Sequence, residues 1–91
     1  MIVSLEEAKQ YLRVDGDEED TLITNFILSA QEICEDVLRI QLSELDPIPE
    51  VIKQAILYTV AQFYELRENT DIQKIIEMVR RLLFAYRKEA W

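Results

Sequence analysis

The chain has 91 residues, of which 49% are apolar, and it carries a formal net charge of −8. It contains no histidine and one cysteine, which excludes a histidine-based hydrolytic triad and a zinc site of cysteines and histidines. This length predicts a single domain over residues 1–91. Because it has no run of about eighteen apolar residues and no basic, apolar leader, we expect a soluble intracellular protein without a membrane partner.

The apolar share bears on how the chain buries its surface, and the charges are unequally divided along the sequence. A domain of this size buries only about two-thirds of its surface, so the apolar share indicates either a well-filled helical core or burial against other copies. Residues 1–50 carry thirteen acids and three bases, whereas residues 51–91 carry five acids and seven bases. The chain is therefore acidic in its first half and mildly basic in its second.

The first predicted helix begins after Ser4, which can form a Ser-x-x-Glu capping box with Glu7. Leu5, Ala8 and Leu12 then recur at helical spacing and predict one apolar face.

A turn with an acidic cluster follows this helix. Gly16 is expected to take the left-handed conformation that a helix end or turn requires. Asp17 is expected to cap a second helix, with Glu18, Glu19 and Asp20 in its first turn, where acids oppose the helix dipole.

The second helix is predicted to run to Leu38 with a continuous apolar stripe. The stripe recurs at intervals of three and four residues and consists of Ile23, Phe26, Ile27, Ala30, Ile33, Cys34, Val37 and Leu38. Within it, Cys34 is expected to act as a small hydrophobe. The polar residues off the stripe are expected to face water, and they are Gln31, Glu32, Glu35 and Asp36.

Two prolines, Pro47 and Pro49, predict a connector over residues 43–49, with Pro49 in the first position of a third helix. This helix is predicted from Glu50 to Glu68, and it is apolar on more than one face. Such a helix is central in the fold or shared with a partner.

A fourth helix is predicted to start at Thr70 or Asp71. Its expected inner stripe consists of Ile72, Ile75, Ile76, Val79, Leu82, Leu83 and Tyr86. The predicted fold class is therefore all-α, a small bundle of about four helices with short loops.

The candidate chemical sites fail on their residue patterns. An EF-hand order is broken because Asp20 stands at the glycine position and Phe26 at the closing glutamate position. A DNA-reading second helix would carry acids and no base before Arg39, so phosphates would repel it. We expect a protein that is not an enzyme, with no catalytic residue, metal ligand or cofactor.

A basic group on the fourth helix, Arg80, Arg81, Arg87 and Lys88, allows three interpretations. It can be a solvated helix end, a phosphate contact, or the partner of an acidic surface on another copy. In the third case it would meet the acidic cluster head to tail, as ring-forming contacts do. The candidate subunit interface then joins this group to Asp15, Asp17, Glu18, Glu19 and Asp20. Trp91 is either an anchor for a partner or a cover for the helix end.

Several segments, in their order and spacing, also resemble one family. They are Ser4 to Asp15, Asp20 to Ala30, Pro49 to Leu57 with Phe63 to Asn69, and Leu82 to Arg87. Together they resemble the small head-tail connector proteins, also called DNA-packaging or head completion proteins, of tailed phages and prophages. Ala85 departs from the family pattern, in which we expect proline before the tyrosine.

The resemblance implies a structural subunit of a ring below the portal, extending the DNA channel and providing the attachment platform for the tail. Its implied partners are copies of itself, twelvefold on the portal, the portal protein and a tail-side completion protein. DNA would pass through without sequence-specific binding. The implied location is the head-tail junction of the virion, after synthesis in the bacterial host cytoplasm. The alternative from the residues alone is a small dimeric helical adaptor or regulatory protein that binds another protein.

Overall fold

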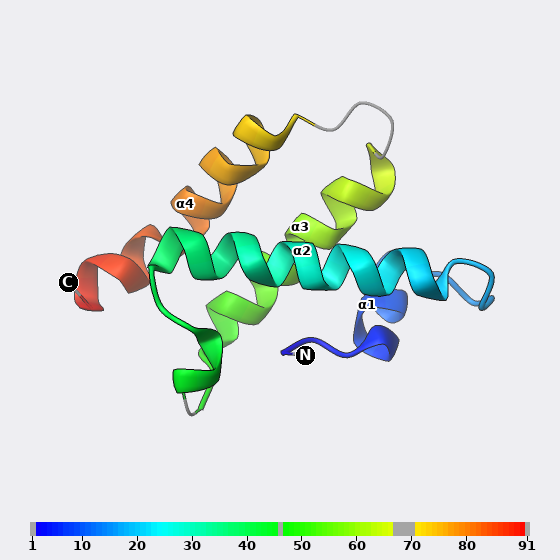
Figure 1. Ribbon diagram of the computed structural model, residues 1–91, viewed down its shortest axis with the longest axis horizontal. Helices are drawn as coiled ribbons and strands as arrows, with labels where there is room; N and C mark the ends of the chain where they lie inside the picture. Colours follow the sequence, from blue (N-terminus) through cyan, green and yellow to red (C-terminus); the bar gives the residue numbers. More distant parts are fainter. Residues whose placement is uncertain (1, 46, 67–70, 91) are drawn as a thin grey trace.

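The computed structural model describes residues 2–45, 47–66 and 71–90, with side chains as far as residue 84 in the last segment. Within these residues the chain forms four α-helices, one 3-10 helix and no strand. The elements are α1 (Leu5–Leu12), α2 (Asp20–Leu38), η1 (Leu42–Glu44), α3 (Glu50–Glu65) and α4 (Ile72–Ala90). The predicted small all-α bundle is confirmed (Figure 1).

Helix α1 begins at the predicted capping box. Ser4 Oγ accepts a hydrogen bond from the Glu7 N–H at 3.0 Å, and Glu7 Oε1 accepts one from the Ser4 N–H at 3.1 Å. The second bond holds the pKa of Glu7 below its ordinary value, because the ionised carboxylate is the better acceptor. Ala8 is fully buried, which sets the face of α1 that meets the core.

The turn between α1 and α2 differs from the prediction. Arg13, and not Gly16, takes the left-handed conformation, with φ 61° and ψ 44°. Helix α2 begins only at Asp20, with Glu19 as its N-cap residue and no side-chain cap hydrogen bond, so the prediction of Asp17 as the cap was wrong. The chain already leaves the helical path at Arg13, and the residues that follow form a turn. Of the three acids expected in the first turn of α2, Asp20 alone lies in it.

The predicted apolar stripe of α2 is confirmed. Its buried members are Ile23, Ile27, Ala30, Cys34, Val37 and Leu38, while Phe26 and Ile33 are partly buried against the same core. The helix ends at Arg39, whose left-handed backbone directs its N–H to the Glu35 carbonyl at 2.7 Å.

Two polar residues of α2 that were expected to face water instead anchor neighbouring segments. Glu35 Oε2 accepts a hydrogen bond from the Leu42 N–H at 2.8 Å, at the start of η1. Gln31 Oε1 accepts one from the Ile2 N–H at 3.2 Å. Both backbone groups would otherwise lack a partner beside the core, since Leu42 is fully buried. Glu35 and Gln31 are therefore partly buried, and the prediction that they face water was wrong.

Helix α3 is the central helix, as its sequence predicts, because it contacts α1, α2 and α4. Pro49 is its N-cap residue, one position before the predicted one. The Thr59 hydroxyl is fully buried and donates to the Ala55 carbonyl at 2.8 Å, so it carries no unpaired polar group into the core. The rings of Phe63 and Phe26 stack with centroids 5.6 Å apart and join α3 to α2. The helix ends at Glu65; its predicted end at residue 68 lies outside the described residues.

Helix α4 buries a narrower stripe than predicted. Asp71 Oδ1 accepts a hydrogen bond from the Lys74 N–H at 3.3 Å at the start of the helix. Ile75, Val79 and Leu83 are buried against α2 and α3 and Ile76 is partly buried, whereas Ile72 and Leu82 are exposed, contrary to expectation. The side chain of Tyr86 lies outside the described set. The narrow stripe arises because α4 packs on the edge of the bundle and not inside it.

The bundle is a flat slab with extents of 41 × 28 × 17 Å. Because helix axes pack about 8–10 Å apart, the shortest extent corresponds to two crossed helix layers. Figure 1 shows α2 lying across α3, with the turn before α2 at one end of the long axis and the C-terminal end of α4 at the other. Among the described helices, none combines the length and apolarity needed to cross a membrane.

Candidate functional site

The acidic cluster of the α1–α2 turn contains two acids that bind other helices of the same chain and three that are exposed. Lys9 Nζ lies 2.7 Å from Asp20 Oδ1, and this contact raises the pKa of Lys9. Tyr64 Oη, on α3, donates to Glu19 Oε1 at 2.6 Å. These two acids therefore fix the turn to α1 and α3. The remaining three, Asp15, Asp17 and Glu18, are exposed.

Neither this cluster nor the cysteine offers a reactive centre in the described part of the chain. No group of three or more histidine, cysteine, aspartate or glutamate residues there is arranged to hold a metal ion. Burial raises the pKa of the Cys34 thiol to about 12, which keeps it protonated at neutral pH and makes it a poor nucleophile.

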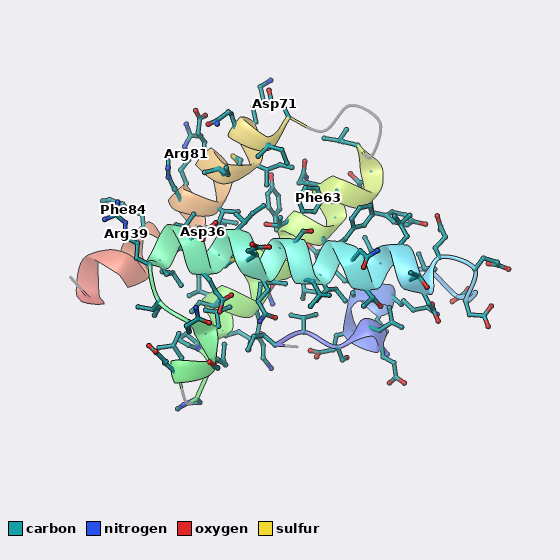
Figure 2. The ribbon with its side chains drawn as sticks, viewed as in Figure 1. Asp36, Arg39, Phe63, Asp71, Arg81 and Phe84 are labelled. Atoms are coloured by element: carbon teal, nitrogen blue, oxygen red, sulfur yellow. The ribbon has the colours of Figure 1, made fainter. Side chains whose placement is uncertain are left out.

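The two described basic residues of the candidate interface, Arg80 and Arg81, are both exposed but occupy different edges of α4. Arg80 lines a small hollow of about 130 Å³ between α4 and α2, together with Asp36 and Ile76. Arg81 is rotated by about 100° around the helix axis, and it lies on the outer side of α4 (Figure 2). The side chains of Arg87 and Lys88, and the whole of Trp91, lie outside the described set.

The structure does not bring the acidic cluster and α4 together within one chain. The turn is at one end of the slab and the basic half of α4 extends toward the other end (Figure 1). A contact between these two surfaces would therefore require a second copy.

Sequence reasoning missed a groove on the outer side of α2. The groove has a volume of about 760 Å³ and lies between the second half of α2 and residues 40–44. It is lined by Leu28, Gln31, Glu32, Glu35, Asp36, Arg39, Ile40, Gln41 and Glu44. The signal available in the sequence was Leu28, a large apolar residue on the polar face of α2. In the structure its side chain is 50% exposed. We call this surface the α2 groove.

Comparison with known proteins decides the family. Residues 2–90 match the family of phage gp6-like head-tail connector proteins. The chain belongs to this family. Neither the curated proteins nor the solved structures compared with this connector gave a match.

Membership assigns the connector a structural role in the phage virion, at the junction of head and tail. The family is not known as a family of enzymes, and it associates with other copies and with portal and tail proteins. The exposed features of the connector thus become candidates for protein contacts. Beyond the charged surfaces, α4 exposes Met78, Leu82 and Phe84, with Phe84 62% exposed.

Proposed function

We propose that the connector is a subunit of a twelvefold ring below the portal, which extends the DNA channel and carries the tail. Its partners in this role are its own copies, the portal protein and a tail-side completion protein. It is made in the cytoplasm of the bacterial host and incorporated at the head-tail junction.

The observation that carries the proposal is the separation of opposite charges on a flat slab. Acids dominate the α1–α2 turn and the outer side of α2, whereas Arg80 and Arg81 lie on the edge formed by α4. Surfaces of opposite charge at different places on one molecule favour heterologous contacts, which close into rings when the rotation allows. A two-fold dimer would pair the two surfaces reciprocally on one partner and would stop at two copies.

The net charge also suits a channel. DNA binding depends on cations that displace counterions from phosphates, and this connector has a formal net charge of −8. The exposed acids Asp15, Asp17 and Glu18 facing the ring interior would repel the passing DNA. A density map of the ring with this turn on the outer circumference would contradict that orientation.

The test of the proposal is the double reversal Arg80→Glu with Arg81→Glu. We expect the variant to keep its helical content by circular dichroism and to lose ring mass by native mass spectrometry in the presence of portal particles. Lys53→Glu is the control. Lys53 lies on α3, and its charge acts on Glu7 of α1. An unchanged ring mass in the double variant would remove α4 from the interface. A wild-type dimer that never grows when portal is added would favour the adaptor function instead.

A further inference from the structure

We propose that the outer face of α4 in one subunit docks into the α2 groove of the next subunit. This inference rests on the proposed ring and specifies its main contact. It replaces the α1–α2 turn, the surface predicted from sequence, as the acidic partner of α4.

The α2 groove offers an acidic and partly apolar surface. Of its four acids, Glu35 is used internally by the Leu42 N–H and Asp36 also lines the hollow beside Arg80 of the same chain, which leaves Glu32 and Glu44. Both are exposed, and no ion pair involving them occurs among the described residues. Arg39 is the single base in the lining. The apolar part comes from Leu28 and from Ile40.

The outer face of α4 presents the complementary pattern. Lys74, Met78, Arg81 and Leu82 follow the spacing i, i+4, i+7 and i+8, so they share one face of the helix. All four are exposed, and Lys74 and Met78 also line a hollow between α4 and the second half of α3. The face therefore combines two cations with two large apolar side chains, and the exposed acid Glu77 lies beside the cations, three residues after Lys74 and four before Arg81.

The two surfaces lie at different places on one subunit. Figure 1 shows α4 on one side of α2 and the connecting segment that borders the groove on the other side. A subunit can therefore use both surfaces at once, toward two different neighbours, which is the geometry of a ring.

The α1–α2 turn is a poorer partner for α4. Two of its five acids, Glu19 and Asp20, already bind Tyr64 and Lys9. Residues 15–20 include no apolar side chain, so Met78 and Leu82 would remain exposed to water in such a contact. The α2 groove offers Leu28 and Ile40, against which these side chains can be removed from water.

Charge reversal in both surfaces tests the contact. Glu32→Lys with Glu44→Lys reverses the groove, and Lys74→Glu with Arg81→Glu reverses α4. We expect each pair to raise the subunit concentration needed for ring assembly about tenfold or more, because like charges then face each other. The chain with all four substitutions should assemble again, since every interface regains opposite charges.

The matched control is Asp17→Lys with Glu18→Lys in the turn, which adds the same charge as the groove pair and should leave assembly unchanged. Sedimentation velocity with portal particles is the readout, and circular dichroism establishes that each variant is folded. Assembly that is lost in the turn variant and kept in the groove variant would overturn the inference while leaving the ring intact. Wild-type protein that forms no ring at all would overturn the proposed function itself.

A second measurement does not depend on charge. In a chain with Leu28→Cys and Leu82→Cys, oxidation should link neighbouring subunits into a ladder of covalent multimers on a non-reducing gel. Cys34 does not interfere because it is buried with a raised pKa. Each single variant is the control and should give no ladder. A double variant that stays monomeric after oxidation of assembled rings would contradict the docking.

Discussion

Ile27 and Leu28 are neighbours in α2 but should respond very differently to truncation. Ile27 is fully buried in the core, whereas Leu28 is 50% exposed at the α2 groove. We expect Ile27→Ala to destabilise the fold strongly and Leu28→Ala to leave the fold nearly intact. In an assay of ring formation with variants that remain folded, we expect Leu28→Ala to have the larger effect, because Leu28 supplies part of the apolar lining of the α2 groove.

The magnitude for Ile27→Ala follows from its burial. The substitution removes three carbon groups at about 0.8 kcal/mol each and leaves a cavity, for a total of about 3–4 kcal/mol within the usual range for such changes. A domain of this length has a free energy of unfolding of about 5–14 kcal/mol, so a third or more of the stability can be lost. The melting temperature should fall by about 12–32 °C. For Leu28→Ala the loss should be about 1 kcal/mol or less, because half of the side chain is already in water.

Urea unfolding followed by circular dichroism at 222 nm, together with thermal melts, measures both variants against the wild type. If the unfolding free energy falls with urea concentration at the same slope in all proteins, the difference in stability between the variants arises in the native core. Equal losses of stability in the two variants would refute the assignment of Ile27 to the core face and Leu28 to the outer face. That result would also mean that Leu28 does not line the α2 groove.

Two further predictions concern the capping box and the cysteine. Ser4→Ala should cost about 1 kcal/mol of stability at neutral pH, because the Glu7 N–H loses its acceptor. Glu7→Ala removes the carboxylate that accepts from the Ser4 backbone N–H; since the folded pKa of Glu7 is depressed below 4.5, the stability from this bond is present above that value and is lost as the pH falls through the folded pKa. The difference in urea midpoint between wild type and Glu7→Ala should therefore shrink in acid, and a constant difference down to strongly acidic pH would contradict the role of Glu7. Cys34 should react with a thiol reagent such as DTNB at pH 8 only after unfolding, because the pKa of the buried thiol is about 12; complete labelling of the folded protein within the mixing time would show that the site is open.

Local patterns predicted the helices and most of their faces. The Ser4–Glu7 capping box and the apolar stripe of α2 depend on residues within one or two turns of each other. Such interactions are determined by helix geometry and do not require knowledge of the rest of the fold. The order and spacing of segments along residues 2–90 likewise identified the head-tail connector family.

Contacts between distant segments could not be predicted in this way. Glu35 has the pattern of a solvated acid, and only the return of the chain toward η1 gives it the Leu42 N–H as a partner. Leu82 has the pattern of a core residue, but α4 lies at the edge of the bundle and leaves it exposed. In the turn, Arg13 takes the left-handed conformation that glycine would adopt more readily, because α1 already ends there.

The amino-acid sequence alone determined the fold class, most of the helix faces, the lack of catalytic residue patterns and the division of charge between the two halves of the chain. The tertiary structure decided where these faces and charges lie relative to one another. Helical periodicity is a local property of a few successive residues, whereas the α2 groove and the outer face of α4 exist only because the helices cross at particular angles. Those crossings place the α2 groove and the outer face of α4 on different sides of α2, so the two surfaces do not meet within one chain.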